Sequence, residues 1–242
     1  MRVSCFECAL RACGLFKPVS RNELAVINDI KREHLAVPAG SEIIRAGQDS
    51  PEVYTLYAGW AFRFKTLPDG RRQILNFLLP GDLVGLQAAM FDAAQHGVEA
   101  LTKVELCLLP RQKVWDLFGQ MPALAFDVTW LGAREESYVD ENLLSAGQRN
   151  AAERVAALIV ILHRRADALG LVADRTFEFP LSQQHIADAL GLSLVHTNKT
   201  LARLRRMEMY TQANGALTLT NPHVLERVAQ CFDQELPRRP LL

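Results

Sequence analysis

Cysteine is the residue type whose placement stands out in this chain of 242 residues. Three of the five cysteines, Cys5, Cys8 and Cys13, lie within nine residues, which random placement rarely produces; the others are Cys107 and Cys231. A cysteine thiolate is a metal ligand and a nucleophile. The odd count argues against a disulfide framework in a reducing compartment. The cluster therefore indicates metal or redox chemistry, although Cys107 also suits an ordinary buried strand position.

The histidines do not form an enzyme's metal site. A metal enzyme on a β-barrel needs two histidines one residue apart on a strand, a carboxylate and a further histidine. The six present are scattered: His34, His96, His163, His185, His196 and His223. Neither a nucleophile elbow nor a phosphate-binding loop is found. We therefore expect no enzyme activity.

A second group of chemically active residues lies in LSQQHIADALGLSLVHTNKTLARLRRMEM, which has the pattern of a helix-turn-helix. Ser182 and Ser193 can cap the two helices. Ala187 lies four residues before Gly191, the spacing of a helix-contact residue and a turn glycine. A helical hairpin with a solvated basic face is the plainer alternative. The hairpin signal Asn214-Gly215 that follows, placed like a wing, favours a DNA-binding unit.

The second helix has an apolar and a polar side at about 100° per residue. Its apolar stripe is expected to contain Leu194, Thr197, Leu201 and Leu204, and its polar side Val195, Lys199 and Arg206, with His196, Asn198 and Arg203 toward the edges. Lysine and arginine can hydrogen-bond guanine or phosphate, and asparagine can read adenine. The candidate DNA-binding residues are therefore Ser182, Ser193, Val195, His196, Asn198, Lys199, Arg203 and Arg206.

The elements that must position these residues are of two kinds. From Leu35, short β-branched runs alternate with turns such as Pro68-Asp69-Gly70, which predicts an antiparallel barrel or roll. From Arg111 the pattern is helical, and residues 126–150 contain no proline. So long a helical stretch is best explained by burial against a twofold copy, although it could lie along its own domain.

Composition agrees with a cytoplasmic globular protein. The formal net charge is zero, and no apolar run reaches the ~18–20 residues of a membrane span. The N-terminus lacks the apolar core and cleavage site of a signal peptide. We expect no membrane association.

Several of these segments resemble the CRP/FNR family of bacterial transcription regulators. The resemblance lies in ERVAALIVILHRRADALG and the helix-turn-helix, and upstream in PAGSEIIRAGQ, VYTLYAGWAFRF, DGRRQILNFLLPGDLVGL and ALTKVELCLLP. It implies an α+β fold with an N-terminal cyclic-nucleotide-binding-type β-roll (jelly roll), a long dimerisation helix and a C-terminal winged helix-turn-helix. The expected domains are a cysteine arm (1–16), the roll (17–118), the dimerisation helix (119–150) and the DNA-binding domain (151–242).

The resemblance also implies partners: a homodimer, a palindromic double-stranded operator and RNA polymerase. The family's base-contacting positions fall on Val195, Asn198 and Lys199. Val195 departs from the family pattern because it cannot hydrogen-bond a base, although it can touch a thymine methyl group.

For the signal, the resemblance leaves three options. Cyclic-AMP-binding relatives hold the phosphate with a Gly-Glu and Arg-Ser cassette, but here Leu86 follows Gly85 and no arginine lies between Arg72 and Arg111. We expect no cyclic AMP binding, because a buried phosphate needs a cation.

The second option is an iron–sulfur cluster, since FNR resembles this chain in having three N-terminal cysteines and one on a later strand of the roll. Cys5, Cys8, Cys13 and Cys107 would hold a [4Fe–4S] cluster. The spacing of four residues between Cys8 and Cys13 departs from the family's usual five or seven. The same thiols also suit zinc or thiol redox chemistry. The third option is another effector or none, with the cysteines structural.

Overall fold

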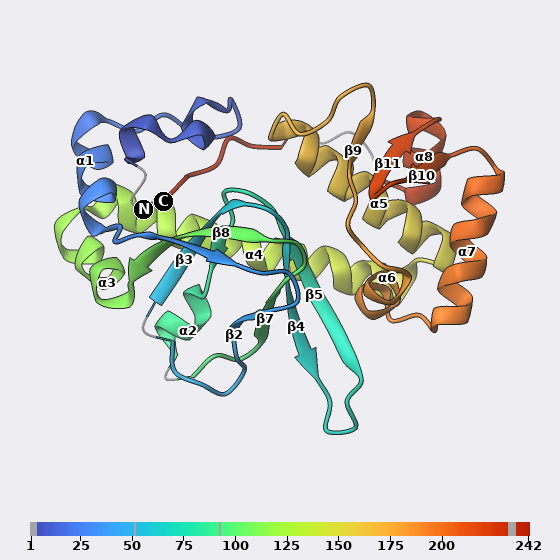
Figure 1. Ribbon diagram of the computed structural model, residues 1–242, viewed down its shortest axis with the longest axis horizontal. Coiled ribbons are helices and arrows are strands. Elements are labelled where there is room, and N and C mark those ends of the chain that lie inside the picture. Colours follow the sequence, from blue (N-terminus) through green and yellow to red (C-terminus); the bar gives the residue numbers. More distant parts are fainter. Residues whose placement is uncertain (1–3, 51, 92, 232–235) are drawn as a thin grey trace. The chain divides into compact units, whose positions relative to one another are not determined.

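The computed structural model describes residues 4–50, 52–91, 93–231 and 236–242 (Figure 1). The chain divides into two compact units. Unit 1 comprises Met1–Lys65, Asn76–Ser137 and Arg238–Leu242, and unit 2 comprises Thr66–Leu75 and Tyr138–Pro237. No helix in the described ranges is long and apolar enough to cross a membrane.

Unit 1 begins with the cysteine arm, which forms two short 3-10 helices, η1 (Cys5–Glu7) and η2 (Ala9–Ala12). Helix α1 (Arg21–Ile30) follows, capped as expected by Ser20. The Ser20 hydroxyl accepts a hydrogen bond from the Glu23 amide, and the Glu23 carboxylate accepts one from the Ser20 amide. This capping box satisfies two backbone donors at the helix start.

The expected β-roll is present as two four-stranded antiparallel sheets. One has the strand order β1-β8-β3-β6 and the other β2-β7-β4-β5. The strands are β1 (His34–Val37), β2 (Glu42–Ile44), β3 (Glu52–Ala58), β4 (Ala61–Thr66), β5 (Arg72–Leu78), β6 (Leu83–Val84), β7 (Gly97–Ala100) and β8 (Val104–Pro110). The β4–β5 hairpin turns at Pro68-Asp69-Gly70, as predicted. Strand β8 lies between β1 and β3, so its residues are buried by neighbours on both edges.

Two apolar clusters stabilise unit 1. The first draws residues from both sheets, including Leu56, Val98 and Leu106, and fills the roll. The second lies where the roll meets its helices and includes Cys5, Ile27, Leu109 and Leu242. The helices beside it are α2 (Leu86–Met90), α3 (Arg111–Gln120) and the first part of α4 (Pro122–Gln148). The arm and the C-terminal residue thus share one core.

The long helical stretch that the sequence predicts over residues 126–150 is helix α4. Helix α4 ends at Gln148, and α5 (Ala151–Ala168) begins with Asn150 as its cap. The Asn150 side chain accepts hydrogen bonds from the amides of Ala152 and Glu153, which ends the first helix and starts the second.

Unit 2 contains α5, β9 (Thr176–Glu178), α6 (Gln183–Leu190), α7 (Leu194–Arg206), β10 (Tyr210–Ala213), β11 (Ala216–Leu219) and α8 (Pro222–Ala229). Strands β10, β11 and β9 form an antiparallel sheet in that order. Helix α5 packs against α7 and α8 and buries Val155, Ile159 and Leu162. Cys231, which the sequence placed on the terminal helix, lies beyond it, because Gln230 ends α8 in the left-handed conformation.

The imidazole of His96, just before β7, gives unit 1 a testable pH dependence. Burial, together with the charges of Arg63 and Lys65, lowers the pKa of His96 to about 4. An unfolded histidine titrates near 6.5, so between these pH values the unfolded chain binds more protons than the folded one. The contribution of His96 is therefore fully present above about pH 6.5 and is lost as pH falls toward 4, amounting to roughly 3 kcal/mol.

We expect His96→Gln to flatten the pH dependence of the unfolding free energy between pH 4 and 6.5, as measured by urea titration at fixed protein concentration. His223→Gln is the matched control, because the His223 side chain is 96% exposed. Equal slopes for the wild type and His96→Gln would contradict the assignment.

Candidate nucleic-acid interface and cysteine site

The two helices of the expected DNA-reading unit begin at capped, exposed N-termini. The Ser182 hydroxyl accepts a hydrogen bond from the His185 amide at 3.1 Å, and His185 Nδ1 accepts one from the Ser182 amide at 3.2 Å. The Ser193 hydroxyl accepts from the His196 amide at 3.2 Å. Both predicted caps are confirmed. Ser182 and Ser193 are exposed, so both helix starts are open to an anion.

The turn between the helices follows the expected pattern. Gly191 ends α6 in the left-handed conformation, with φ of 63°, which favours glycine. The amides of Gly191 and Leu192 both donate to the Ala187 carbonyl oxygen. Ala187 is 2% exposed, as a small residue at a helix contact should be. This turn sets the direction in which α7 leaves α6.

Helix α7 has a dry side and a basic side. Thr197, Thr200, Leu201 and Leu204 are buried, whereas Val195, His196, Lys199, Arg203 and Arg206 are exposed. The expected apolar stripe is wrong at Leu194, which is 42% exposed because it is the first residue of the helix. Thr200 is buried on that side of the helix instead. Asn198 is half-buried, and its Oδ1 is covered without a hydrogen-bond partner in the described structure.

The basic side of α7 carries uncompensated charge. Within the described ranges, none of Lys199, Arg203 and Arg206 forms an ion pair. Positive charge in the last turn of a helix is favourable because the carbonyl end of the helix dipole is negative. The cations are therefore available to phosphate or base edges without first breaking a salt bridge.

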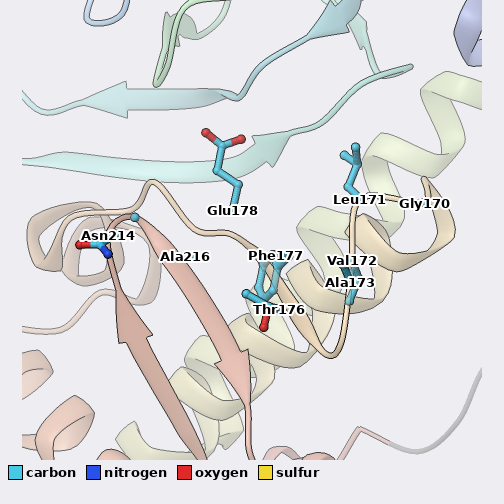
Figure 2. Close-up of a pocket in the computed structure, with 10 residues that line it drawn as sticks. Gly170, Leu171, Val172, Ala173, Thr176, Phe177, Glu178, Asn214 and Ala216 are labelled. Atoms are coloured by element: carbon cyan, nitrogen blue, oxygen red, sulfur yellow. The ribbon is translucent and has the colours of Figure 1, made fainter.

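The hairpin after α7 forms as predicted. Asn214 and Gly215 both have positive φ, 51° and 75°, which is the geometry of a two-residue turn matched to strand twist. An open pocket of about 410 Å³ lies beside this turn and is lined by the connection from α5, by β9 and by the hairpin (Figure 2). Glu178 is its one ionisable lining residue, so the pocket adds no cation to the basic side of α7.

The cysteine site centres on strand β8. Cys107 is 3% exposed and pairs in register with His34 on β1. Its Sγ lies 3.2 Å from His34 Nε2. Burial raises the pKa of the Cys107 thiol. Burial lowers the pKa of His34, and the positive charge of Lys31 lowers it further. Near neutral pH the pair is therefore a thiol beside a neutral imidazole.

The arm brings two further thiols toward the same place. Cys5 is 3% exposed, and its amide donates to Asn28 Oδ1 at 3.1 Å, which ties the arm to α1. Burial lowers the pKa of the Arg11 guanidinium, and negative charge on Cys5, Cys8 and Cys107 would raise it. Arg11 is thus a cation within electrostatic range of three thiols.

The four cysteines expected to act together are only partly assembled. Cys5, Cys8 and Cys107 lie within electrostatic range of Arg11, whereas Cys13 caps the end of η2 and is half-buried. In the described part of the chain, no three histidine, cysteine or acidic side chains lie close enough to hold one metal ion. Cys231 belongs to unit 2, where its Sγ lies 3.9 Å from an Arg149 nitrogen.

Sequence reasoning missed His34 and Arg11 as parts of this site. Arg11 stands between Cys8 and Cys13, so its charge was visible in the motif. His34 is 73 residues from Cys107, and only the pairing register of β1 and β8 shows that they meet.

Comparison with known proteins identifies the architecture. Residues 34–121 match the cyclic nucleotide-binding domain, and residues 153–228 match the Crp-like helix-turn-helix domain. The chain is 28% identical over 226 residues to the nitrogen fixation regulation protein FixK of Bradyrhizobium diazoefficiens, covering 93% of each chain. It is 26% identical to the fumarate and nitrate reduction regulatory protein of Vibrio cholerae, covering 94% of this chain and 90% of that protein.

A solved structure agrees. FixK2 from Bradyrhizobium japonicum superposes with a TM-score of 0.72 at 26% identity, covering 82% of this chain and 97% of that one. The chain belongs to the CRP/FNR family of regulators. It is a DNA-binding transcription regulator of that type, and such regulators act as dimers. The expected order of β-roll, long helix and helix-turn-helix is confirmed.

The hydroxyl of Thr197 offers a test of the packing of α7. Thr197 is fully buried, and its Oγ1 has no hydrogen-bond partner in the described structure. Burying an unsatisfied hydroxyl costs about 1–3 kcal/mol, so Thr197→Val should raise the unfolding free energy. Thr200→Val is the matched control, because Thr200 Oγ1 donates to the His196 carbonyl at 2.9 Å and its loss should bring no gain. A fall in stability for Thr197→Val, measured by thermal melting, would refute this reading.

Proposed function

We propose that α7 lies in the major groove of a palindromic operator and that Lys199, Arg203 and Arg206 contact phosphates and guanine. The observation that carries this proposal is the exposed, unpaired basic side of α7 opposite a buried side that fixes its orientation. Val195 and His196 lie at the start of the same helix, where they can reach base edges. Ser182 and Ser193, at exposed helix N-termini, can contact phosphates. Asn198 reads a base only if its half-buried amide turns outward.

The exposed side of α4 suits the expected homodimer. Phe126 is 66% exposed and Leu144 is 50% exposed. They are eighteen residues apart, about five helical turns, and so share one side of the helix. Half-buried Trp130 lies on the same side. Exposed apolar side chains on this helix suit burial against the same helix of a second copy, which would place two recognition helices about one DNA turn apart. RNA polymerase is the expected further partner.

We expect Lys199→Ala and Arg203→Ala each to weaken binding to a duplex from the region upstream of the chain's own gene. Each lost phosphate contact should also reduce the slope of log affinity against log salt by about one. Fluorescence anisotropy at several salt concentrations measures both effects. Lys103→Ala, an exposed cation of unit 1, is the control and should bind as the wild type does. Unchanged affinity and slope in both α7 variants would contradict the proposed groove contacts.

For the sensed signal, we propose oxygen or redox state, detected through a [4Fe–4S] cluster held by Cys5, Cys8, Cys13 and Cys107. The ligand types fit, because thiolates are what such clusters use, and Cys5 and Cys107 both belong to the buried residues of unit 1. When bound, such a cluster supplies oxygen-labile redox chemistry. Arg11 would offset the negative charge of the thiolates, and Cys13 would have to approach through a rearrangement of the arm. The regulator named for fumarate and nitrate reduction is a relative in keeping with this proposal.

Two other arrangements are open to the same cysteines. A zinc ion would need four thiolates in a closed tetrahedron. Alternatively the cysteines are structural and the roll takes another effector or none. The pairing of Cys107 with His34 inside the sheet is compatible with an ordinary buried role. The spectroscopic experiment below distinguishes these arrangements.

We expect protein reconstituted with iron and sulfide without oxygen to be brown, to contain about four iron atoms per chain and to bleach in air. Cys5→Ser, Cys8→Ser, Cys13→Ser and Cys107→Ser should each lower the iron content sharply, because the ligands of a cluster depend on one another. Cys231→Ser is the matched control and should retain colour and iron. Colourless reconstituted protein excludes the cluster, and stoichiometric zinc in that protein supports a zinc site instead.

A further inference from the structure

Residues 239–242 are buried in unit 1. Arg239, Leu241 and Leu242 are each 1–2% exposed. The tail runs beside the cysteine arm: the Lys17 amide donates to the Arg239 carbonyl, and the Arg239 amide donates to the Leu15 carbonyl, both at 2.9 Å. Figure 1 shows this red segment next to the blue N-terminal part of the chain. The tail and the arm are therefore joined by an isolated parallel bridge between Arg239 and Phe16.

Arg239 is recognised through its side chain. It forms an ion pair with Asp82, and its Nη2 donates to the Pro80 carbonyl oxygen at 2.8 Å. Its guanidinium also lies 5.0 Å from the centre of the Phe16 ring. A buried cation is tolerated only where it is paired and hydrogen-bonded, so these contacts select for arginine at this position.

The last two residues of the tail are also held by hydrogen bonds. The Thr55 hydroxyl donates to the Leu242 carbonyl oxygen, and an Arg11 nitrogen donates to the Leu241 carbonyl oxygen at 3.0 Å. The Leu242 side chain belongs to the same apolar cluster as Cys5. Arg238, by contrast, is exposed.

We propose that unit 1 contains a recognition site for a peptide segment with the sequence Arg-Pro-Leu-Leu, and that its occupant is the chain's own residues 239–242. The cysteine arm supplies one wall of this site through residues 11–17. Arg11 lies in the arm between Cys8 and Cys13 and donates to the tail, and Leu242 packs in the same core cluster as Cys5. Tail binding and arm conformation are therefore linked: whatever displaces the arm weakens the tail, and release of the tail loosens the arm by the same free energy.

The tail site does not depend on the proposed iron–sulfur cluster, because all of its contacts are made by the metal-free chain. Its most direct consequence concerns Cys5, whose burial depends on the arm lying against the core that Leu242 completes. A docked tail protects Cys5 from reagents in solution, and a released tail exposes it.

The first experiment uses a metal-free chain that ends at Pro237 and a peptide of residues 236–242 with a fluorophore at its N-terminus. Fluorescence anisotropy should show saturable binding. A peptide with Arg239→Ala should bind at least tenfold more weakly, and one with Arg238→Ala should bind as the unaltered peptide does. Equal binding of the two variant peptides, or none of the unaltered peptide, would overturn the recognition site.

The second experiment uses the full-length, metal-free chain and does not depend on the truncated chain folding. The rate at which a maleimide alkylates Cys5, located by peptide mass spectrometry, should rise at least tenfold in Arg239→Ala. It should stay at the wild-type rate in Arg238→Ala. Wild-type rates in both variants would show that the tail does not protect the arm. Neither measurement involves iron, so either result leaves the cluster proposal to its own test.

Discussion

The carboxylate of Asp82 is the interaction on which the arrangement of unit 1 depends. Asp82 is 1% exposed, and a charge so deeply buried requires several partners. It accepts a hydrogen bond from the Leu79 amide at 2.8 Å and pairs with Arg239 and, at 3.4 Å, with Arg134. These partners come from the turn between β5 and β6, from the C-terminal tail and from α4. Removing one partner of such a group typically costs about 3–5 kcal/mol, because the charge that is left has no compensation.

This carboxylate connects the β-roll to the elements that carry the thiols. The turn containing Asp82 is joined to β3 through backbone hydrogen bonds with Leu56, and β3 pairs with β8, which carries Cys107. Arg239 joins the same turn to the arm through Phe16. A change in the arm is therefore a change in contacts with a tightly packed core rather than the movement of a loose end. Since packed cores shift between discrete arrangements, such a core suits a switch.

The parts of the fold that could be read from the sequence are those specified by local chemistry. Ser20, Ser182 and Ser193 cap helices because their hydroxyls reach amides a few residues ahead. The turns at Gly70 and Gly215 form because glycine accepts positive φ. Helix periodicity placed the basic side of α7 correctly, yet it assigned Leu194 to the dry side, because periodicity alone does not show where packing begins.

The parts that could not be read depend on contacts between distant segments. The meeting of His34 with Cys107 follows from strand register, and the burial of Leu242 follows from a groove that several elements build together. In the candidate sites, the residue types were visible in the sequence, whereas the contact of the His34 imidazole with the Cys107 thiol was not.

The central claim is that the state of the thiols in unit 1 governs binding of DNA by unit 2. The most direct measurement is the affinity of one reconstituted sample for a palindromic operator duplex, determined by anisotropy without oxygen and again after exposure to air at the same salt concentration. The account predicts at least tenfold tighter binding before exposure, and no such difference for Cys107→Ser. Equal affinity before and after exposure in the wild type, with the loss of iron confirmed in the same sample, would contradict it.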